Sequence, residues 1–249
     1  MSPLVAAALS LGLLALVFVP LERVFPARPG QAHLRPAWAI DLAFFLGQHL
    51  VFAGVALAVL QAVHGSINDL AIPTCFKGLP LWGKLPLAVV GGDLLTYWFH
   101  RACHRYRLLW RFHAVHHSAE HLDFLAAHRE HPVDGVLTQL CVNLPGMLLG
   151  IPFAALAGLI ALRGLWAIFI HANVRLPLGP LRLLGAPELH HWHHARIETR
   201  HNFANLAPYL DVLFGTYHRP AGPETYPLGL TEPWPRRFLV QLIRPLRGP

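Results

Sequence analysis

The stretch that decides the fold is Asp93-Leu-Leu-Thr-Tyr97-Trp-Phe-His100-Arg-Ala-Cys-His104, which ends an apolar run that begins near residue 81. His100 and His104 are four residues apart, so on a helix they lie on one face. Asp93 and Tyr97 lie seven and three residues before His100, on the same stripe. An aspartate in a membrane helix is costly without a partner. We therefore predict a membrane helix ending in a metal-binding face, with Asp93 and Tyr97 hydrogen bonded in the outer shell of the site.

The composition places the chain in a lipid bilayer. Of its 249 residues, 54% are hydrophobic and only 13% are charged, and the mean hydropathy is +0.42. This apolar content excludes a disordered chain and is too high for an ordinary soluble domain. The 20 basic residues are scattered through loops rather than gathered with aromatic residues into a groove. Nucleic acid is therefore not an expected partner.

Apolar stretches occur at about 4–20, 37–63, 81–99 and 136–171. A bilayer crossing needs roughly 20 helical residues, so the last stretch can cross twice. Its middle contains Pro145, Gly146, Gly150 and Pro152, which suit the tip of a hairpin. We predict an all-α membrane bundle of four or five spans with a histidine-rich helical cap, and a first span retained as an anchor.

Arginine predicts the orientation of the chain in the membrane. Four arginines fall between residues 101 and 111, after the third span, and nine more lie from Arg175 onward. Loops rich in arginine and lysine face the cytoplasm. We therefore expect the histidines on the cytoplasmic side. Only two of the 20 basic residues are lysine, which is typical of a GC-rich bacterial genome, so a bacterial inner membrane is expected.

Two further histidine clusters repeat one spacing, HxxHH. Their members are His113, His116 and His117 in the first cluster, and His190, His193 and His194 in the second. Imidazole nitrogens at helical offsets of three and four can converge on one ion, and they suit Zn, Cu, Fe and Ni. With His100 and His104 they make eight ligands, too many for one four-coordinate zinc. We infer a site for two metal ions.

Five further residues near these clusters complete the predicted site. His171 ends the last span at the same membrane face, so we expect it to be a ninth ligand. Asn173 and His191 are expected in the outer shell, His191 because it points away from the face formed by its neighbours. Arg129 and Arg196 are candidates for binding an anionic lipid headgroup.

Two more elements accompany the histidine clusters: Arg129-Glu-His131-Pro132 lies between the two HxxHH clusters, and Asn202-Phe203…Asp211-Val-Leu-Phe-Gly-Thr-Tyr217 follows the second of them. In this order the five elements, from about Asp93 to Tyr217, resemble the membrane fatty acid hydroxylase and sterol desaturase superfamily of non-haem di-iron enzymes. One departure is Ala204, where relatives often carry glycine.

The resemblance implies an oxidoreductase that uses two iron ions, dioxygen and two external electrons on a lipid from the bilayer. The electron donor would be a ferredoxin or a cytochrome with its reductase. Zinc could replace iron in purified protein, and His131 would belong to the outer shell. Both hydroxylation and a sterol-type desaturation remain open.

A zinc-dependent membrane hydrolase is the rival prediction, because histidine sites also hold zinc and activate water. The chain lacks HExxH, and the acidic residues near the boxes are Glu120, Glu188 and Glu198. A metal transporter would carry ionisable residues through mid-membrane. The expected organisation is an anchor region at 1–84, a hydroxylase-like catalytic domain at 85–220 and a proline-rich tail at 221–249.

Overall fold

The computed structural model describes residues 1–32, 34–70, 76, 78–197 and 200–247, and every regular element in these ranges is helical, as predicted. The α-helices are α1 (Pro3–Val24), α2 (Trp38–Gly47), α3 (Ala53–Asp69), α4 (Leu81–Arg105), α5 (Arg107–His117), α6 (Pro132–Leu148), α7 (Phe153–His171), α8 (Pro187–His193), α9 (Pro208–Leu213) and α10 (Phe238–Ile243). Short helical turns are η1 (Gln48–Phe52), η3 (Ala126–His128), η4 (Gly179–Leu184) and η5 (Arg244–Arg247).

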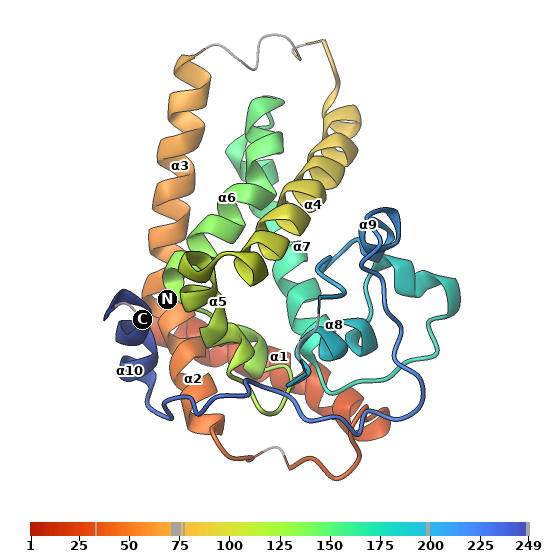
Figure 1. Ribbon diagram of the computed structural model, residues 1–249. Helices are drawn as coiled ribbons and strands as arrows, with labels where there is room; N and C mark the ends of the chain where they lie inside the picture. Colours follow the sequence, from red (N-terminus) through yellow and green to blue (C-terminus); the bar gives the residue numbers. More distant parts are fainter. Residues whose placement is uncertain (33, 71–75, 77, 198–199, 248–249) are drawn as a thin grey trace.

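Helices α3, α4, α6 and α7 form the long part of the molecule, and α5, α8, α9 and the C-terminal segment form a wider cap at one end (Figure 1). Among the described residues, three helical segments are long and apolar enough to cross a membrane: α1, the continuous helix Trp38–Asp69, and α7. Together with the apolar composition, they identify a membrane protein. Helices α4 and α6 are not among the three; α6 has only 17 residues.

The predicted hairpin is present, with its tip between the end of α6 at Leu148 and the start of α7 at Phe153. Gly150 has φ +65°, a left-handed conformation that glycine adopts without strain, and the amide of Ile151 bonds to the carbonyl of Gly146. Pro145 lies inside α6, and Pro152 precedes α7 as its N-cap. The hairpin returns the chain to the cap, where α7 ends at His171.

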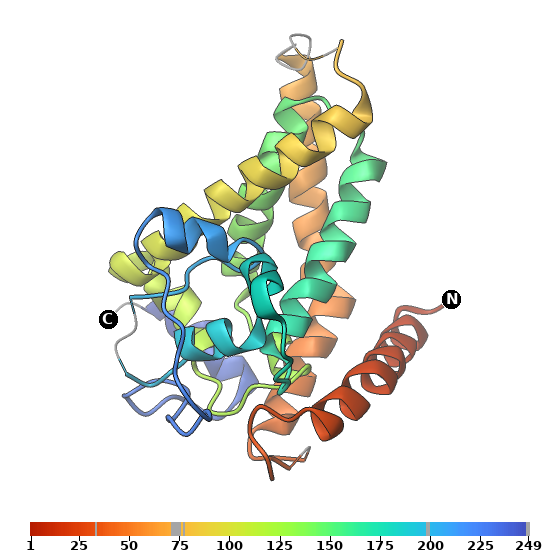
Figure 2. The same cartoon turned by 90° about the vertical axis from the view of Figure 1, so that its right-hand side faces the viewer.

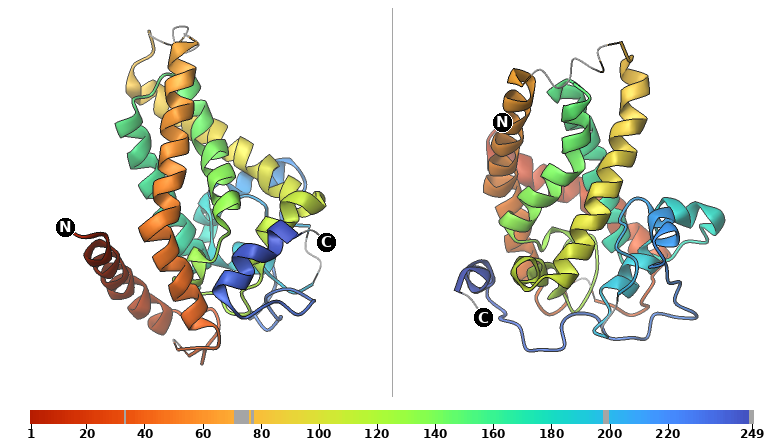
Figure 3. Two further views of the ribbon diagram at one scale, coloured as in Figure 1. Left: turned by 90° about the vertical axis from the view of Figure 1, so that its left-hand side faces the viewer. Right: turned by 45° about the horizontal axis from the view of Figure 1, so that its top comes forward.

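Helix α1 runs obliquely past the cap end of the bundle rather than alongside α3, and its N-terminus points away from the other helices (Figures 2 and 3). Its C-terminal half packs through Phe18 against Phe45 and Phe124. Glu22 is buried there and accepts the backbone N–H groups of Phe124 and Asn173. This end of α1 is therefore attached to the loops around the histidines.

Helices α4 and α6 approach closely because two consecutive glycines of α4 face α6. A Cβ atom on Gly92 would overlap the carbonyl oxygen of Val142, and one on Gly91 would lie 2.9 Å from the Cβ of Pro145. This contact fixes α4, the helix that carries His100 and His104, against α6.

Substituting Gly92→Ala is expected to lower the free energy of unfolding by about 1–3 kcal/mol, because overpacking displaces the helices. Thermal unfolding in a neutral detergent measures it. Gly158→Ala in α7 is the control, since no atom lies within 4 Å of its Cβ position. Equal melting temperatures for the two variants would contradict the close packing.

Candidate metal centre

The nine predicted histidine ligands come from four helices whose ends meet at the junction of bundle and cap (Figure 1). Helix α4 supplies two, α5 three, the last residue of α7 one, and α8 with its C-cap three. Seven are buried, and His104 and His116 are partly buried. Segments far apart in the sequence therefore deliver their imidazoles to one place.

The nine histidines form two groups in which one ligand nitrogen from each residue lies within 4.8 Å of all the others. The first group contains His100, His104, His113, His117 and His193, and the second contains His116, His171, His190 and His194. The groups adjoin, since the rings of His117 and His194 stack at 4.3 Å between centroids. The geometry thus offers two neighbouring places for a cation.

Outward hydrogen bonds determine which ring nitrogen faces inward. The Nδ1 atoms of five histidines lie 2.6–3.0 Å from acceptor oxygens, so each carries a hydrogen and donates it. The pairs are His100 with the carbonyl of Phe203, His113 with the Asp134 carboxylate, His116 with the carbonyl of Arg129, His171 with that of Ala167, and His193 with that of His201. In a neutral imidazole the Nε2 atom then presents a lone pair.

Those lone pairs face one another. The Nε2 atoms of His100 and His193 are 2.9 Å apart, and those of His116 and His171 are 3.0 Å apart. Neither nitrogen of either pair has a hydrogen to donate, so the contacts are unfavourable unless a cation lies between them. In addition, the Nε2 atom of His104 is buried without a hydrogen-bond partner. The donor set therefore fits two metal ions bound by neutral imidazoles.

Burial keeps the imidazoles in their ligand form. Burial, with a smaller contribution from the neighbouring His113, lowers the pKa of His116 and of His193 from 6.5 to about 3. Burial also moves the pKa of His190 and His194 well below 6.5. These rings are uncharged at neutral pH, as metal ligation requires.

The same pKa values predict how the metal-free protein responds to acid. Because the folded pKa lies below the unfolded value, the unfolded chain binds protons first as the pH falls, so stability present above about pH 6.5 is lost toward pH 3. When the pH falls from about 7 to about 5, the protonation equilibrium of each of these two histidines is expected to lower the free energy of unfolding by about 2 kcal/mol. Chemical denaturation of chelator-treated protein measures this; a flat profile would contradict it.

Asp134 is a residue of the site that the sequence did not reveal. It lies in the first turn of α6, is buried, and accepts the Nδ1 hydrogen of His113 at 2.8 Å. A carboxylate behind a ligating histidine fixes its tautomer and raises its basicity. The sequence feature that could have indicated Asp134 is its position two residues after Pro132, in a helix next to the HxxHH cluster.

Substituting Asp134→Asn is expected to weaken metal binding about 10–100-fold, because His113 loses its charged acceptor. Competition with a chelator of known affinity measures the change. Asp69→Asn, at the exposed end of α3, is the matched control. Equal affinity in both variants would show that Asp134 does not orient His113.

The five residues predicted to lie in the outer shell form hydrogen bonds or ion pairs with residues other than the nine histidines. Their partners are Arg163 for Asp93, Thr216 and Arg101 for Tyr97, Arg28 for Asn173, Glu224 for His191, and the Val133 amide and Leu242 carbonyl for His131. Asp93 lies about 10 Å before His100 along the helix, too far to reach it. His131 caps α6 instead. The outer-shell prediction for these side chains is corrected accordingly.

The segment from Asn202 to Tyr217, the last of the five sequence elements, holds one wall of the site. Asp211 accepts the backbone N–H groups of Phe203 and Ala204, and the carbonyl of Phe203 in turn accepts the hydrogen of His100. Asn202 has φ +58°, a conformation that asparagine tolerates better than most residues. Since Ala204 is not in the left-handed region, the turn accommodates alanine there.

A cavity of about 170 Å³ adjoins the histidines. Five of the nine line it: His100, His113, His116, His171 and His190. The rest of the wall comes mainly from α4, α6 and α7 and includes the ion pair between Asp93 and Arg163, whose atoms are 2.6 Å apart, and Gln139. A molecule in this cavity would lie between helices α4, α6 and α7 and beside five of the nine histidines.

The two predicted headgroup arginines lie outside this cavity. Arg129 is 3% exposed and paired with Asp41, and Arg196 pairs with Glu120 at 3.1 Å. The carboxylates considered for a hydrolase are similarly occupied, Glu120 by two arginines and Glu188 by Arg182 and Arg219. Glu198 lies outside the described residues.

Comparison with known families agrees with the site. The sequence model described as Fatty acid hydroxylase matches residues 85–216, more than half of the chain. The chain belongs to this family, as the histidine motifs predicted. No solved structure matches the chain significantly.

The chain is similar to proteins from several branches of lipid chemistry. An ornithine lipid hydroxylase of Rhizobium tropici is 32% identical over 67% of this chain and 51% of its own length. An alkylglycerol monooxygenase of Danio rerio is 33% identical over 61% of this chain and 35% of its own length. A Delta(7)-sterol 5(6)-desaturase of Gibberella zeae is 28% identical over 63% of this chain and 44% of its own length. All are oxidoreductases. The chain spans about half or less of the length of these relatives.

Proposed function

We propose that the chain is a di-iron oxygenase that inserts one oxygen atom into a C–H bond of a polar membrane lipid. In the overall reaction the lipid, dioxygen, two electrons and two protons give the hydroxylated lipid and water. The observation that carries the proposal is that unprotonated Nε2 atoms face one another within each of two adjoining histidine groups. Iron would supply the reduction of dioxygen, since side chains alone cannot oxidise an unactivated C–H bond.

The residues of the chain hold the metals and exclude competing chemistry. The first histidine group would bind one ion and the second group the other. Imidazole suits iron, and four or five nitrogens leave room for an open position at each ion. The backbone carbonyls and Asp134 keep the rings in place, and burial limits access of water to the site.

The cavity supports a lipid substrate with a polar portion. Its walls carry Asp93, Arg163 and Gln139 from three helices of the bundle, so polar groups lie within reach of the histidines. Asp93 and Arg163 already pair with each other, and a polar substituent of the substrate could add hydrogen bonds to these groups that a plain hydrocarbon chain cannot make. The relatives named as an ornithine lipid hydroxylase and an alkylglycerol monooxygenase support polar lipids as well.

In this proposal α4 and α6 join the three apolar segments to make five spans, and the cap with the histidines faces the cytoplasm of a bacterial cell. The arginines that follow α4 and those from Arg175 onward favour that side. A ferredoxin or cytochrome with its reductase would deliver electrons there.

The experiment is lipid mass spectrometry of cells that carry the gene or lack it, with and without oxygen. We expect lipids that gain one oxygen atom, and none in cells carrying His193→Ala, which loses a ligand. His218→Ala is the control, because that histidine belongs to neither group. Lipids that lose two hydrogens instead would show the desaturase alternative, and an unchanged lipid profile would refute oxygenation.

Metal analysis of anaerobically purified protein separates the zinc hydrolase. The oxygenase is expected to hold two irons per chain, with zinc present only where it has replaced iron. A single zinc that supports turnover without dioxygen would establish the hydrolase.

A further inference from the structure

The cap contains a second hollow, of about 320 Å³, which shares no lining residue with the cavity at the histidines. Its walls come from the segment before α2, the start of α2, the end of α5, Arg129, and residues 230–236 of the proline-rich C-terminal segment. Ser118 on its wall directly follows His117, and Arg129 accepts the hydrogen of His116 at its carbonyl. The hollow therefore lies directly behind the metal ligands.

Several N–H groups on its lining residues have no hydrogen-bond partner in the described part of the chain. Arg129 is 3% exposed; its Nε atom bonds Asp41 and its Nη1 atom bonds Ser118, but its Nη2 atom is unpaired. The Nε1 atom of Trp234 and the Nε atom of Arg196 are also buried and unpaired. Leaving a buried donor unpaired is costly, so these groups are suited to a ligand with acceptor atoms.

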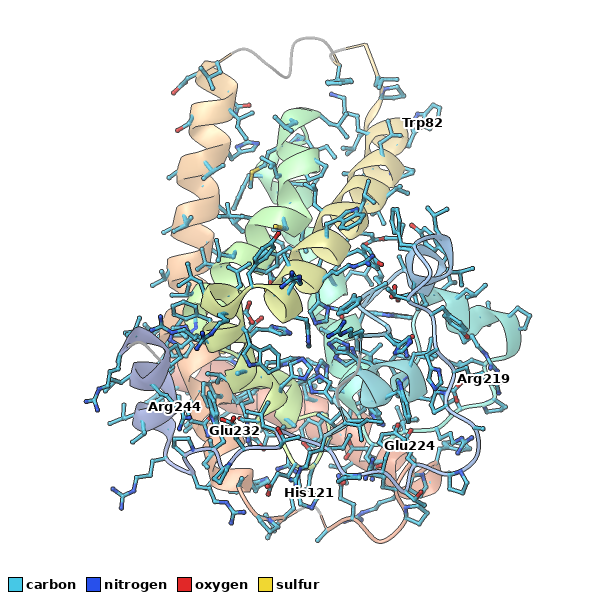
Figure 4. The ribbon with its side chains drawn as sticks, viewed as in Figure 1. Trp82, His121, Arg219, Glu224, Glu232 and Arg244 are labelled. Carbon is cyan, nitrogen blue, oxygen red and sulfur yellow. The ribbon has the colours of Figure 1, made fainter. Side chains whose placement is uncertain are left out.

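The charges of the wall are already arranged in pairs. Arg35 and Arg129 are balanced by Asp41 and Asp123, so the inner wall has no net charge. Arg196 and Arg236 share Glu120 at 3.1 and 3.3 Å, and Glu232 lies on the exposed rim of the cap (Figure 4). The selectivity of the hollow therefore rests on its buried donors, which outnumber the one buried, unpaired side-chain acceptor among the described lining residues, Gln241.

We propose that this hollow binds a phosphate or carboxylate group, with Arg129 and Trp234 as its principal donors. A tetrahedral or planar oxyanion offers several acceptor oxygens to N–H groups that come from different segments. The volume accepts the anion together with part of an attached molecule. The group could belong to a lipid headgroup or to a free anion, and the chemistry of recognition is the same.

Isothermal titration calorimetry on the full chain in neutral detergent tests the proposal, with inorganic phosphate and a short-chain phosphatidic acid as probes. We expect saturable binding at one site per chain. Trp234→Phe retains the ring but removes the donor, and it should weaken binding about tenfold. Trp82→Phe is the control, because Trp82 is 78% exposed at the opposite end of the molecule (Figure 4).

A second variant, Arg129→Lys, retains a charge for Asp41 but loses the fork of donors, and should also weaken binding by about tenfold or more. Melting temperatures of both variants identify any loss of folding. Similar affinities for both probes would identify a free anion as ligand, and much tighter binding of phosphatidic acid would identify a headgroup. Absence of saturable binding, or unchanged binding by a folded Trp234→Phe variant, would overturn the proposal. The assay needs no turnover, so it is independent of the proposed oxygenase activity.

Discussion

The structure depends on one electrostatic constraint: nine imidazoles are packed at a buried junction, and in two pairs of them, His100 with His193 and His116 with His171, the nitrogen lone pairs are directed at one another. Such an arrangement is repulsive alone and favourable around cations. The rest of the described fold serves to keep the rings there. The glycine contact between α4 and α6 positions the first histidine pair, and the hairpin of α6 and α7 brings His171 back to the cap.

The support for the rings comes largely from the backbone. Four of the five Nδ1 hydrogens go to main-chain carbonyls, those of Phe203, Arg129, Ala167 and His201, and only His113 uses a side chain. Main-chain acceptors hold a ring without requiring a particular residue type. This explains why loops between the histidine clusters contribute to the site although few of their side chains touch it.

The apolar stretches and their proline and glycine interruptions were enough to predict the helical fold and the hairpin, and the histidine spacing predicted the residues that converge. HxxxH and HxxHH each report one helix face, so local geometry carries that information. The outer partners depend on how distant elements dock, which one sequence does not encode locally. Asp93 shares a stripe with His100 but meets Arg163 of α7, and Asp134 meets His113 only because α6 packs beside α5.

The most direct test of this account is anomalous X-ray scattering at the iron edge from crystals of anaerobically prepared protein. Two peaks are expected, one inside each histidine group, with imidazole nitrogens as the protein ligands. A single peak, or histidine rings that stay in place around no metal while the protein is active, would contradict it.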